Sequence, residues 1–376
     1  QRAKILFYLP KNSLHQKYML FSKQLILLVV ERCDIMAVAR KRGRFWTVMA
    51  ILAIALIILF FASFLIGRYP IAPAAVWDII CSHFINIPVY WDATMEQVVL
   101  QVRLPRILLG ILVGGALSIS GASYQTLFKN PMASPDLLGV SAGAGFGASL
   151  VMLDGGTWWQ IQSSAFLFGI IAVLAAWLIS RVFGGQNITV LVLAGIVVSS
   201  FFQSLLSIVK TLADTDDALP SITFWLMGSL GRANADDVLV MLPATVISLA
   251  LLFFFRYQID TLAAGEAEAA SMGVNVPLVK VVVIVSSTLL TVSAVSICGI
   301  IGWIGMVVPH IARLLVGASY TKLAAASFLV GGLFLLIIDN VIRAIGVGTL
   351  PLGVLTSLIG TPVFVVLLSK ARKAWL

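Results

Sequence analysis

The chain has 376 residues, of which 60% are hydrophobic and only 11% are charged, and its formal net charge is +9. A soluble domain carries about 25% charged residues, so this composition excludes a soluble globular protein. Continuous apolar runs, instead of short alternating segments, exclude a membrane β-barrel and predict an all-α polytopic membrane protein. The basic residues gather in loops and form no basic face with interleaved aromatics, so we expect no nucleic-acid partner.

The first 35 residues differ from the rest of the chain. Their apolar run, QLILLVV, is too short to cross a bilayer, and no small-residue cleavage site follows it. Met36 then precedes the basic stretch AVARKRGRF. We therefore expect residues 1–35 to be an N-terminal extension, either non-native or disordered, and residues 36–376 to form the membrane domain.

Ten apolar segments approach the length of about 20 residues that a membrane-spanning helix needs. The basic cluster at 40–44 precedes the first segment and predicts a cytoplasmic amino terminus. An even number of spans returns the carboxyl terminus, with its KARK sequence, to the same side. The expected spans are approximately 46–66, 104–128, 137–153, 162–182, 188–209, 237–255, 277–297, 300–316, 323–342 and 350–368.

Two connections between these spans are longer than tight turns. In the outer one, at 212–237, the apolar stretch SITFWLMGSL (221–230) predicts a half-helix, because irregular backbone at membrane depth is tolerated where it lines a cavity. In the inner one, at 256–280, the spacing of apolar residues predicts a short amphipathic helix. Gly273 is placed to end this helix and Pro277 to begin the next span.

No motif in the sequence predicts catalysis or metal binding. There is no H-E-x-x-H, no P-loop, and no cysteine and histidine spacing that suits zinc, so we expect no catalytic residue, no metal ligand and no cofactor in this chain. His310 is a lone histidine, for which a hydrogen-bonded structural role is the simpler interpretation. An intramembrane enzyme that uses His310 remains the alternative.

Charged residues are nearly absent from the middle of the expected spans, which argues against an ion-gradient-driven secondary transporter without excluding it. Asp339 and Arg343 have the i,i+4 spacing of an ion pair. The span count places Arg103 and Arg106 outside, against the usual charge rule. Glycines recur in the second and third spans, where close helix packing is the simpler interpretation and pathway lining the alternative.

Four segments together resemble the permease subunits of type II ABC importers, the FecCD-type family that imports iron–siderophores, haem and cobalamin. The first runs from RLPR at 103–106 to GAGFGA at 143–148. The others are FWLMGSL (224–230), GIIGWIGMVVPHIARLLVG (299–317) and PLGVLTSLIGTPVFVVLL (351–368). The resemblance covers about 46–370 and implies a ten-span permease domain in a bacterial or archaeal cytoplasmic membrane.

The resemblance also implies partners. Family members form homodimers around a central pathway, receive cargo from an extracytoplasmic substrate-binding protein, and bind two ATPase subunits inside, so ATP would be hydrolysed on those subunits. Matched residue by residue, the ATPase-coupling positions are Ala263, Gly265, Glu266, Ala269, Met272 and Gly273. The matching pathway positions are Leu193, Gly195, Ser199, Phe202, Gln203, Phe224, Trp225 and Met227.

The outer arginines gain a role from the same resemblance. In the cobalamin importer, arginines at the positions of Arg103, Arg106 and Arg343 face glutamates of the binding protein. Anchoring to lipid headgroups is the alternative. The family often has an acid before the last span, where this chain has Thr349 in TLPLG. An iron chelate, as a siderophore or haem, is the expected cargo, and cobalamin or an oxyanion such as molybdate is the alternative.

Overall fold

The computed structural model describes residues 43–83, 85–184, 187–345 and 350–375, with side chains up to 366. The expectations for residues 1–35 and for Thr349 lie outside the described residues. The chain divides into two units, Gln1–Ile51 and Leu52–Leu376, and the packing below is that of the second unit.

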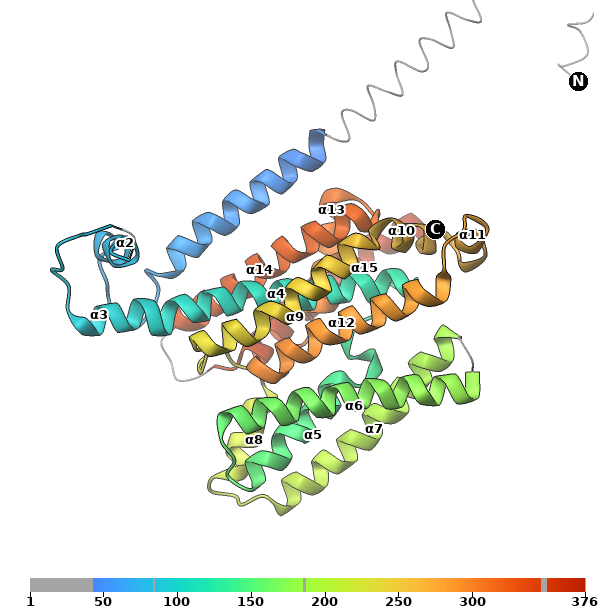
Figure 1. Cartoon of the computed structure of the whole chain (residues 1–376), viewed down its shortest axis with the longest axis horizontal. Helices are drawn as coiled ribbons and strands as arrows, with labels where there is room; N and C mark the ends of the chain where they lie inside the picture. Colours follow the sequence, from blue (N-terminus) through green and yellow to red (C-terminus); the bar gives the residue numbers. More distant parts are fainter. Residues whose placement is uncertain (1–42, 84, 185–186, 346–349, 376) are drawn as a thin grey trace, which may run out of the picture. The chain divides into compact units, whose positions relative to one another are not determined.

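Ten apolar helices are present in the described part of the chain (Figure 1). Seven are long enough to cross a membrane: Gly43–Ser63, the continuous helix Ala93–Leu127, α6 (Trp158–Gly184), α7 (Ile188–Leu212), α9 (Ala235–Phe254), α12 (Val276–Cys298) and α14 (Tyr320–Ile345). Three are shorter in their apolar part: α5 (Val140–Leu153), α13 (Ile304–Val316) and α15 (Leu352–Trp375). The all-α polytopic fold class is confirmed.

The second span extends well beyond the hydrocarbon length. Helix α3 (Ala93–Gln97) continues through the π-helix η1 (Val98–Arg103) into α4 (Leu104–Leu127). Together they form one 35-residue helix, whose first turns precede the expected start at 104. The expected bounds came from hydrophobicity, which does not mark where a helix continues into polar surroundings. Helix α14 likewise begins and ends three residues outside its expected range.

Helix α4 lies at the centre of the packing, in contact with α9, α12, α13 and α14. Its glycines permit backbone contact: a Cβ atom on Gly114 would lie 2.2 Å from the carbonyl oxygen of Gly331 in α14. A Cβ atom on Gly121 would lie 1.7 Å from the carbonyl oxygen of Gly305 in α13. Close packing therefore explains these glycines.

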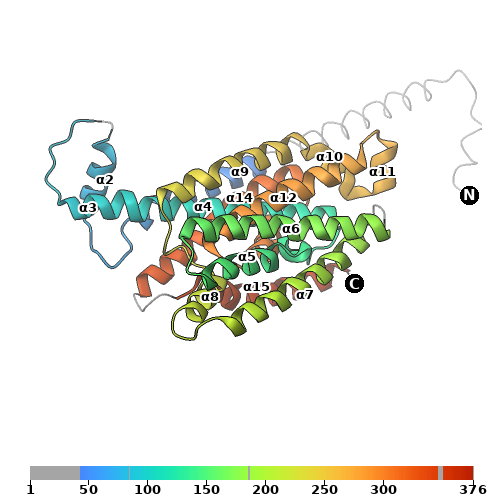
Figure 2. The same ribbon diagram turned by 60° about the horizontal axis from the view of Figure 1, so that its bottom comes forward.

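Helices α5, α6 and α7 pack on one another as a second group (Figure 2). The 3-10 helix η2 (Pro135–Leu138) leads into α5 through Gly139, whose φ of 85° is left-handed. A Cβ atom on Gly195 of α7 would lie only 2.1 Å from the carbonyl oxygen of Leu137 in η2. Within α5 itself, Gly143 and Gly147 face carbonyl oxygens of Phe168 and Ser164 in α6, so the short third span packs closely on its neighbour.

The connections differ from expectation in detail. The half-helix is α8 (Ala218–Leu226), which begins three residues earlier than predicted. The inner connection holds two helices, α10 (Arg256–Ala264) and α11 (Glu266–Ser271), because the chain turns at Gly265. Gly273, at a φ of 80°, follows α11, and Pro277 lies in the first turn of α12, as predicted. Helix α2 (Pro73–Cys81) was not expected, because its nine residues are too few for a span.

Candidate functional site

The three predicted docking arginines converge at one end of α4 and α14, around Asp339. We call Arg103, Arg106, Asp339, Asn340 and Arg343 the arginine cluster. Asp339 is fully buried, and its carboxylate is shared by two guanidinium groups. Arg106 donates to Asp339 through Nε and Nη2, at 2.9 and 2.8 Å from Oδ1. Nε of Arg343 lies 3.0 Å from Oδ2, so the predicted i,i+4 pair is confirmed.

The remaining donors of the arginine cluster hold the chain that follows the first membrane helix. Arg103 is 4% exposed and donates to the carbonyl oxygens of Phe64 and Tyr69. Nη1 of Arg343 donates to the carbonyls of Ser63 and Ile66, each at 2.9 Å. The carbonyls of Ser63, Phe64 and Ile66 lie at the end of the first membrane helix, where carbonyl oxygens have no intrahelical donor. The two arginines therefore cap this helix from other helices.

The cluster carries an excess of positive charge, with three guanidiniums and one carboxylate. The side chain of Arg106 is 18% exposed and that of Arg343 is 8% exposed, so both are largely occupied within the chain. Arg106 is the member with the most surface left for a partner. The docking role of Arg103, Arg106 and Arg343 stays a prediction.

The coupling segment, α10 and α11, presents only some of its predicted residues. Ala263, Met272 and Gly273 are exposed, and Met272 is 75% exposed. Glu266 is half exposed, and its Oε2 lies 2.7 Å from Nζ of Lys280 in α12. Gly265 and Ala269 are buried and face the rest of the chain. The exposed members form a surface that a partner protein could contact.

Sequence reasoning missed Asp260, which attaches this segment to α14. Its carboxylate accepts hydrogen bonds from the backbone N–H groups of Tyr320 and Thr321 and from the hydroxyls of Ser319 and Thr321. The Thr321 hydroxyl lies 2.7 Å away. A carboxylate at a helix amino terminus satisfies free N–H groups and favours the helix dipole. The available signal was only a Ser-x-Thr sequence before a helix, 60 residues distant.

The predicted pathway residues of α7 fall on two faces. Leu193 and Gln203 are exposed, and Ser199 is half-buried. Gly195 and Phe202 lie on the opposite face, where Phe202 packs against Phe146 and Phe168. In α8, Trp225 is buried, whereas Phe224 and Met227 are half-buried. Gly195 and Phe202 therefore support the exposed face rather than line it.

Hydroxyl groups lie on both sides of Gln203 along the exposed face of α7. We call this the polar stripe: Ser200, Gln203, Ser204, Ser207 and Thr211, all exposed. Each hydroxyl donates to the carbonyl oxygen four residues earlier. At about 100° per residue these side chains fall within roughly one third of the helix circumference. The Gln203 amide makes no hydrogen bond with any described residue.

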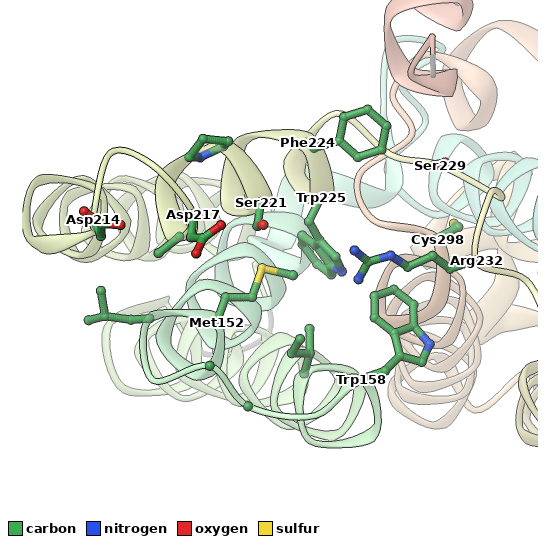
Figure 3. A pocket seen from close by; sticks show the side chains of 16 residues that line it. Met152, Trp158, Asp214, Asp217, Ser221, Phe224, Trp225, Ser229, Arg232 and Cys298 are labelled. Carbon is green, nitrogen blue, oxygen red and sulfur yellow. The ribbon is translucent and has the colours of Figure 1, made fainter. Parts of the chain in front are cut away.

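A pocket of about 720 Å³ opens where the α5–α6 turn meets α8 and the connection between α8 and α9. We call it the tryptophan pocket, because Trp158 and Trp225 line it (Figure 3). The guanidinium of Arg232 lies 5.3 Å from the centre of the Trp158 ring. Asp214 and Asp217 line the pocket on the other side of Trp225 (Figure 3). The sequence motifs give no signal for this pocket, since its walls come from three separate connections.

Two further predictions concern metal and catalysis. Nδ1 of His310 lies 2.8 Å from the carbonyl oxygen of Met306 one turn earlier, and its ring packs against Phe364. This geometry is that of a structural histidine. Within the described ranges, no three His, Cys, Asp or Glu side chains gather as metal ligands.

Comparison with known proteins agrees with this architecture. The FecCD transport family profile matches residues 55–370. The molybdate import system permease protein MolB of Haemophilus influenzae is 34% identical, covering 86% of this chain and 95% of its own. A probable iron chelatin transport system permease protein of Helicobacter pylori is 36% identical over 79% and 90%. The hemin transport system permease protein HmuU of Yersinia pestis is 34% identical over 74% and 85%.

A solved structure has the same fold. A metal-chelate type ABC transporter in an inward-facing conformation superimposes with a TM-score of 0.76 at 34% identity, covering 86% of this chain and 99% of that one. The helix order, the half-helix and the family match thus all indicate the same family. This chain belongs to the FecCD transport family and is a multi-pass permease of the type II ABC importer class.

Proposed function

We propose that the chain is the transmembrane permease subunit of an ATP-driven, binding-protein-dependent importer. Two copies would form a homodimer in a bacterial or archaeal cytoplasmic membrane, with both termini in the cytoplasm. Two ATPase subunits would bind the exposed residues of α10 and α11, and a substrate-binding protein would dock at the arginine cluster. The family membership and the positions of these two surfaces support this assignment.

The polar stripe carries the transport proposal. A Gln203 amide facing lipid without a partner would cost about 4–8 kcal/mol, as for transfer of an amide to hydrocarbon. The stripe must therefore face water or another protein chain, as it would along a pathway between two copies. Leu193 continues this face toward the other end of α7.

An iron chelate, as a siderophore or haem, is the proposed cargo. The relatives of Helicobacter pylori and Yersinia pestis are named for iron chelatin and hemin transport, and the chain is similar to both along most of its length. Molybdate is the competing cargo, because MolB of Haemophilus influenzae is similar to a comparable degree. Cobalamin is a third, through a similar permease of Halobacterium salinarum.

Reconstitution tests the proposal. The permease, its ATPase and its binding protein are placed in liposomes with ATP inside, and uptake of a labelled ferric chelate, haem, cobalamin or molybdate is measured. We expect uptake that needs ATP and the binding protein and that falls when Gln203 is replaced by Leu. Uptake that continues without ATP but collapses with the proton gradient would instead establish a secondary transporter.

A further inference from the structure

The tryptophan pocket is lined by hydrogen-bond donors that have no acceptor among the described residues, among them the indole N–H groups of Trp158 and Trp225. Trp225 is 6% exposed, and its indole N–H has no hydrogen-bond partner among the described residues. Arg232 is exposed, contacts the Trp158 ring, and forms no ion pair with the described part of the chain. Figure 3 shows the Trp225 ring nitrogen turned toward the Arg232 guanidinium. The buried Trp225 N–H requires an acceptor from outside the chain, and the adjacent Arg232 guanidinium can bind the same group.

An anion would suit both donors. A buried donor left without an acceptor costs about 1–3 kcal/mol, and a guanidinium prefers a planar oxyanion that it can bind through two N–H groups. A carboxylate placed between Arg232 and Trp225 would satisfy both side chains. The contact with the Trp158 ring, 5.3 Å from its centre, restricts the positions that the guanidinium can take.

The remaining walls of the pocket indicate the chemistry of the rest of the ligand. Met152, Ile161 and Phe224 supply apolar surface, whereas Asp214 and Asp217 lie on the other side of the pocket. A volume of about 720 Å³ falls within the range of small-molecule sites, roughly 300–1,000 Å³. A bare tetrahedral oxyanion would leave most of this volume and the apolar surface uncontacted. The walls thus fit an organic body whose far end donates hydrogen bonds or carries positive charge.

We propose that the tryptophan pocket binds an organic carboxylate, with the carboxylate between Arg232 and Trp225 and the organic body against Met152 and Phe224. The carboxylate could belong to a free organic acid or to a metal chelate, which offer the same group to the pocket. The proposal rests on the proposed function only for the second source, since a chelate in the pocket would be the transported cargo.

Binding to the purified permease in nanodiscs tests the site without ATPase or binding protein. Tryptophan fluorescence is titrated with citrate, ferric citrate and molybdate. We expect citrate or ferric citrate to bind, and Arg232→Gln to weaken this binding about tenfold or more, as for loss of a charged hydrogen bond. Trp225→Phe keeps the ring and removes the N–H, so we expect about a fivefold weakening.

Arg181 provides the matched control. Its guanidinium lies 5.1 Å from the centre of the Trp177 ring, and Trp177 lies in α6, the helix that begins with Trp158. Arg181→Gln should leave citrate binding unchanged. Absence of binding by both citrate forms up to about 10 mM, a concentration that corresponds to a free energy of about −3 kcal/mol, would overturn the proposal. Equal weakening by Arg232→Gln and Arg181→Gln, or equally tight binding of molybdate, would also overturn it.

Binding of citrate and ferric citrate to the permease alone can be compared with uptake by the whole complex, so the site and the transport function are tested independently. Ferric citrate bound more tightly than citrate would support a chelate site, and citrate bound more tightly would support a free-acid site; either result supports a carboxylate pocket. Failure of uptake in the reconstituted complex with citrate binding intact would contradict the importer and leave the site standing. Uptake unchanged by Arg232→Gln, with citrate binding absent, would contradict the site alone.

Discussion

The two ends of α14 are both fastened by an aspartate, but in opposite ways. At Asp339 a fully buried carboxylate is shared by Arg106 and Arg343, and the surrounding groups are charged. At the other end, half-buried Asp260 comes from α10 and accepts hydrogen bonds from the backbone and hydroxyl groups of residues 319–321. One end depends on a buried carboxylate that offsets the charge of two guanidiniums, and the other depends on capping a helix.

This difference predicts that the two ends of α14 tolerate loss of their aspartates to different degrees. A buried carboxylate between two guanidiniums cannot be removed without leaving buried charge uncompensated. A capping carboxylate can be lost at the cost of a few hydrogen bonds, because its partners are neutral N–H and hydroxyl groups and no buried charge is left uncompensated. The arginine end should therefore behave as a rigid anchor, and the Asp260 end as a joint that can loosen while the membrane helices remain folded.

Replacing Asp339 should have the largest effect on stability. Asp339→Asn keeps the shape of the side chain and leaves Arg106 and Arg343 without their shared counter-charge. We expect a loss of about 3–5 kcal/mol in the free energy of unfolding, measured by thermal unfolding in detergent.

Exposed Asp154, which has no ion pair in the described structure, supplies the control as Asp154→Asn. Adding Arg106→Gln to Asp339→Asn removes one of the uncompensated charges, so the double variant should recover part of the loss. If the double variant is as unstable as the sum of the two single variants, charge balance is not what holds this end.

Replacing Asp260 should have a smaller effect on stability and a local one on α10 and α11. Asp260→Ala removes the acceptor of the α14 amino terminus, at a cost of about 0.5–2 kcal/mol. Hydrogen exchange should then quicken at 256–271 and at 319–322, while the backbone near Asp339 keeps its protection. Glu268→Gln, an exposed change in α11, is the control. Equal loss of protection at both ends of α14 would show that they are not independent.

The sequence predicted the parts of this comparison that are local along the chain. Hydrophobicity predicted the spans, and the i,i+4 spacing predicted the contact of Asp339 with Arg343. It did not predict Arg106 as the second partner of Asp339, 233 residues away, nor the contact of Asp260 with α14. Both depend on how helices distant in sequence pack, which periodicity does not encode.

The candidate pathway on α7 shows a second limit of prediction from the sequence. Large apolar residues such as Ile196 and Phe201 are exposed on α7 beside the polar stripe, so hydrophobicity alone does not reveal which side faces the chain. Phe202 and Gln203 are neighbours in the sequence, yet one packs against Phe146 and Phe168 and the other is exposed. The resemblance supplied both positions without their orientation. In the structure, the close approach of Gly195 to Leu137 and the packing of Phe202 assign the buried face.

Binding-protein docking should separate the members of the arginine cluster. Arg106, the most exposed, should give a docking defect on Arg106→Gln of up to about fivefold, as for a surface ion pair. The defect should shrink as salt rises from low to physiological concentration. Arg103→Gln should lower stability more than docking, because Arg103 is buried against carbonyl groups.

Surface plasmon resonance with the cognate binding protein at two salt concentrations measures this difference. Charge reversal of a partner glutamate should restore docking only for a matched reversal at Arg106. A docking affinity at low salt that is the same for the wild type and Arg106→Gln would leave the arginine cluster with a purely structural role.

The smallest effect on stability is expected at Glu266, beside the Asp260 joint. Its ion pair with Lys280 is half exposed, so Glu266→Gln should change the free energy of unfolding by about 0.2–1 kcal/mol, and less at high salt. Because the fold is nearly unaffected, a fall in ATP-driven uptake on Glu266→Gln would arise from lost contact with the ATPase subunit. Uptake and unfolding that are both unchanged would remove Glu266 from the coupling surface and leave exposed Ala263, Met272 and Gly273 to form it.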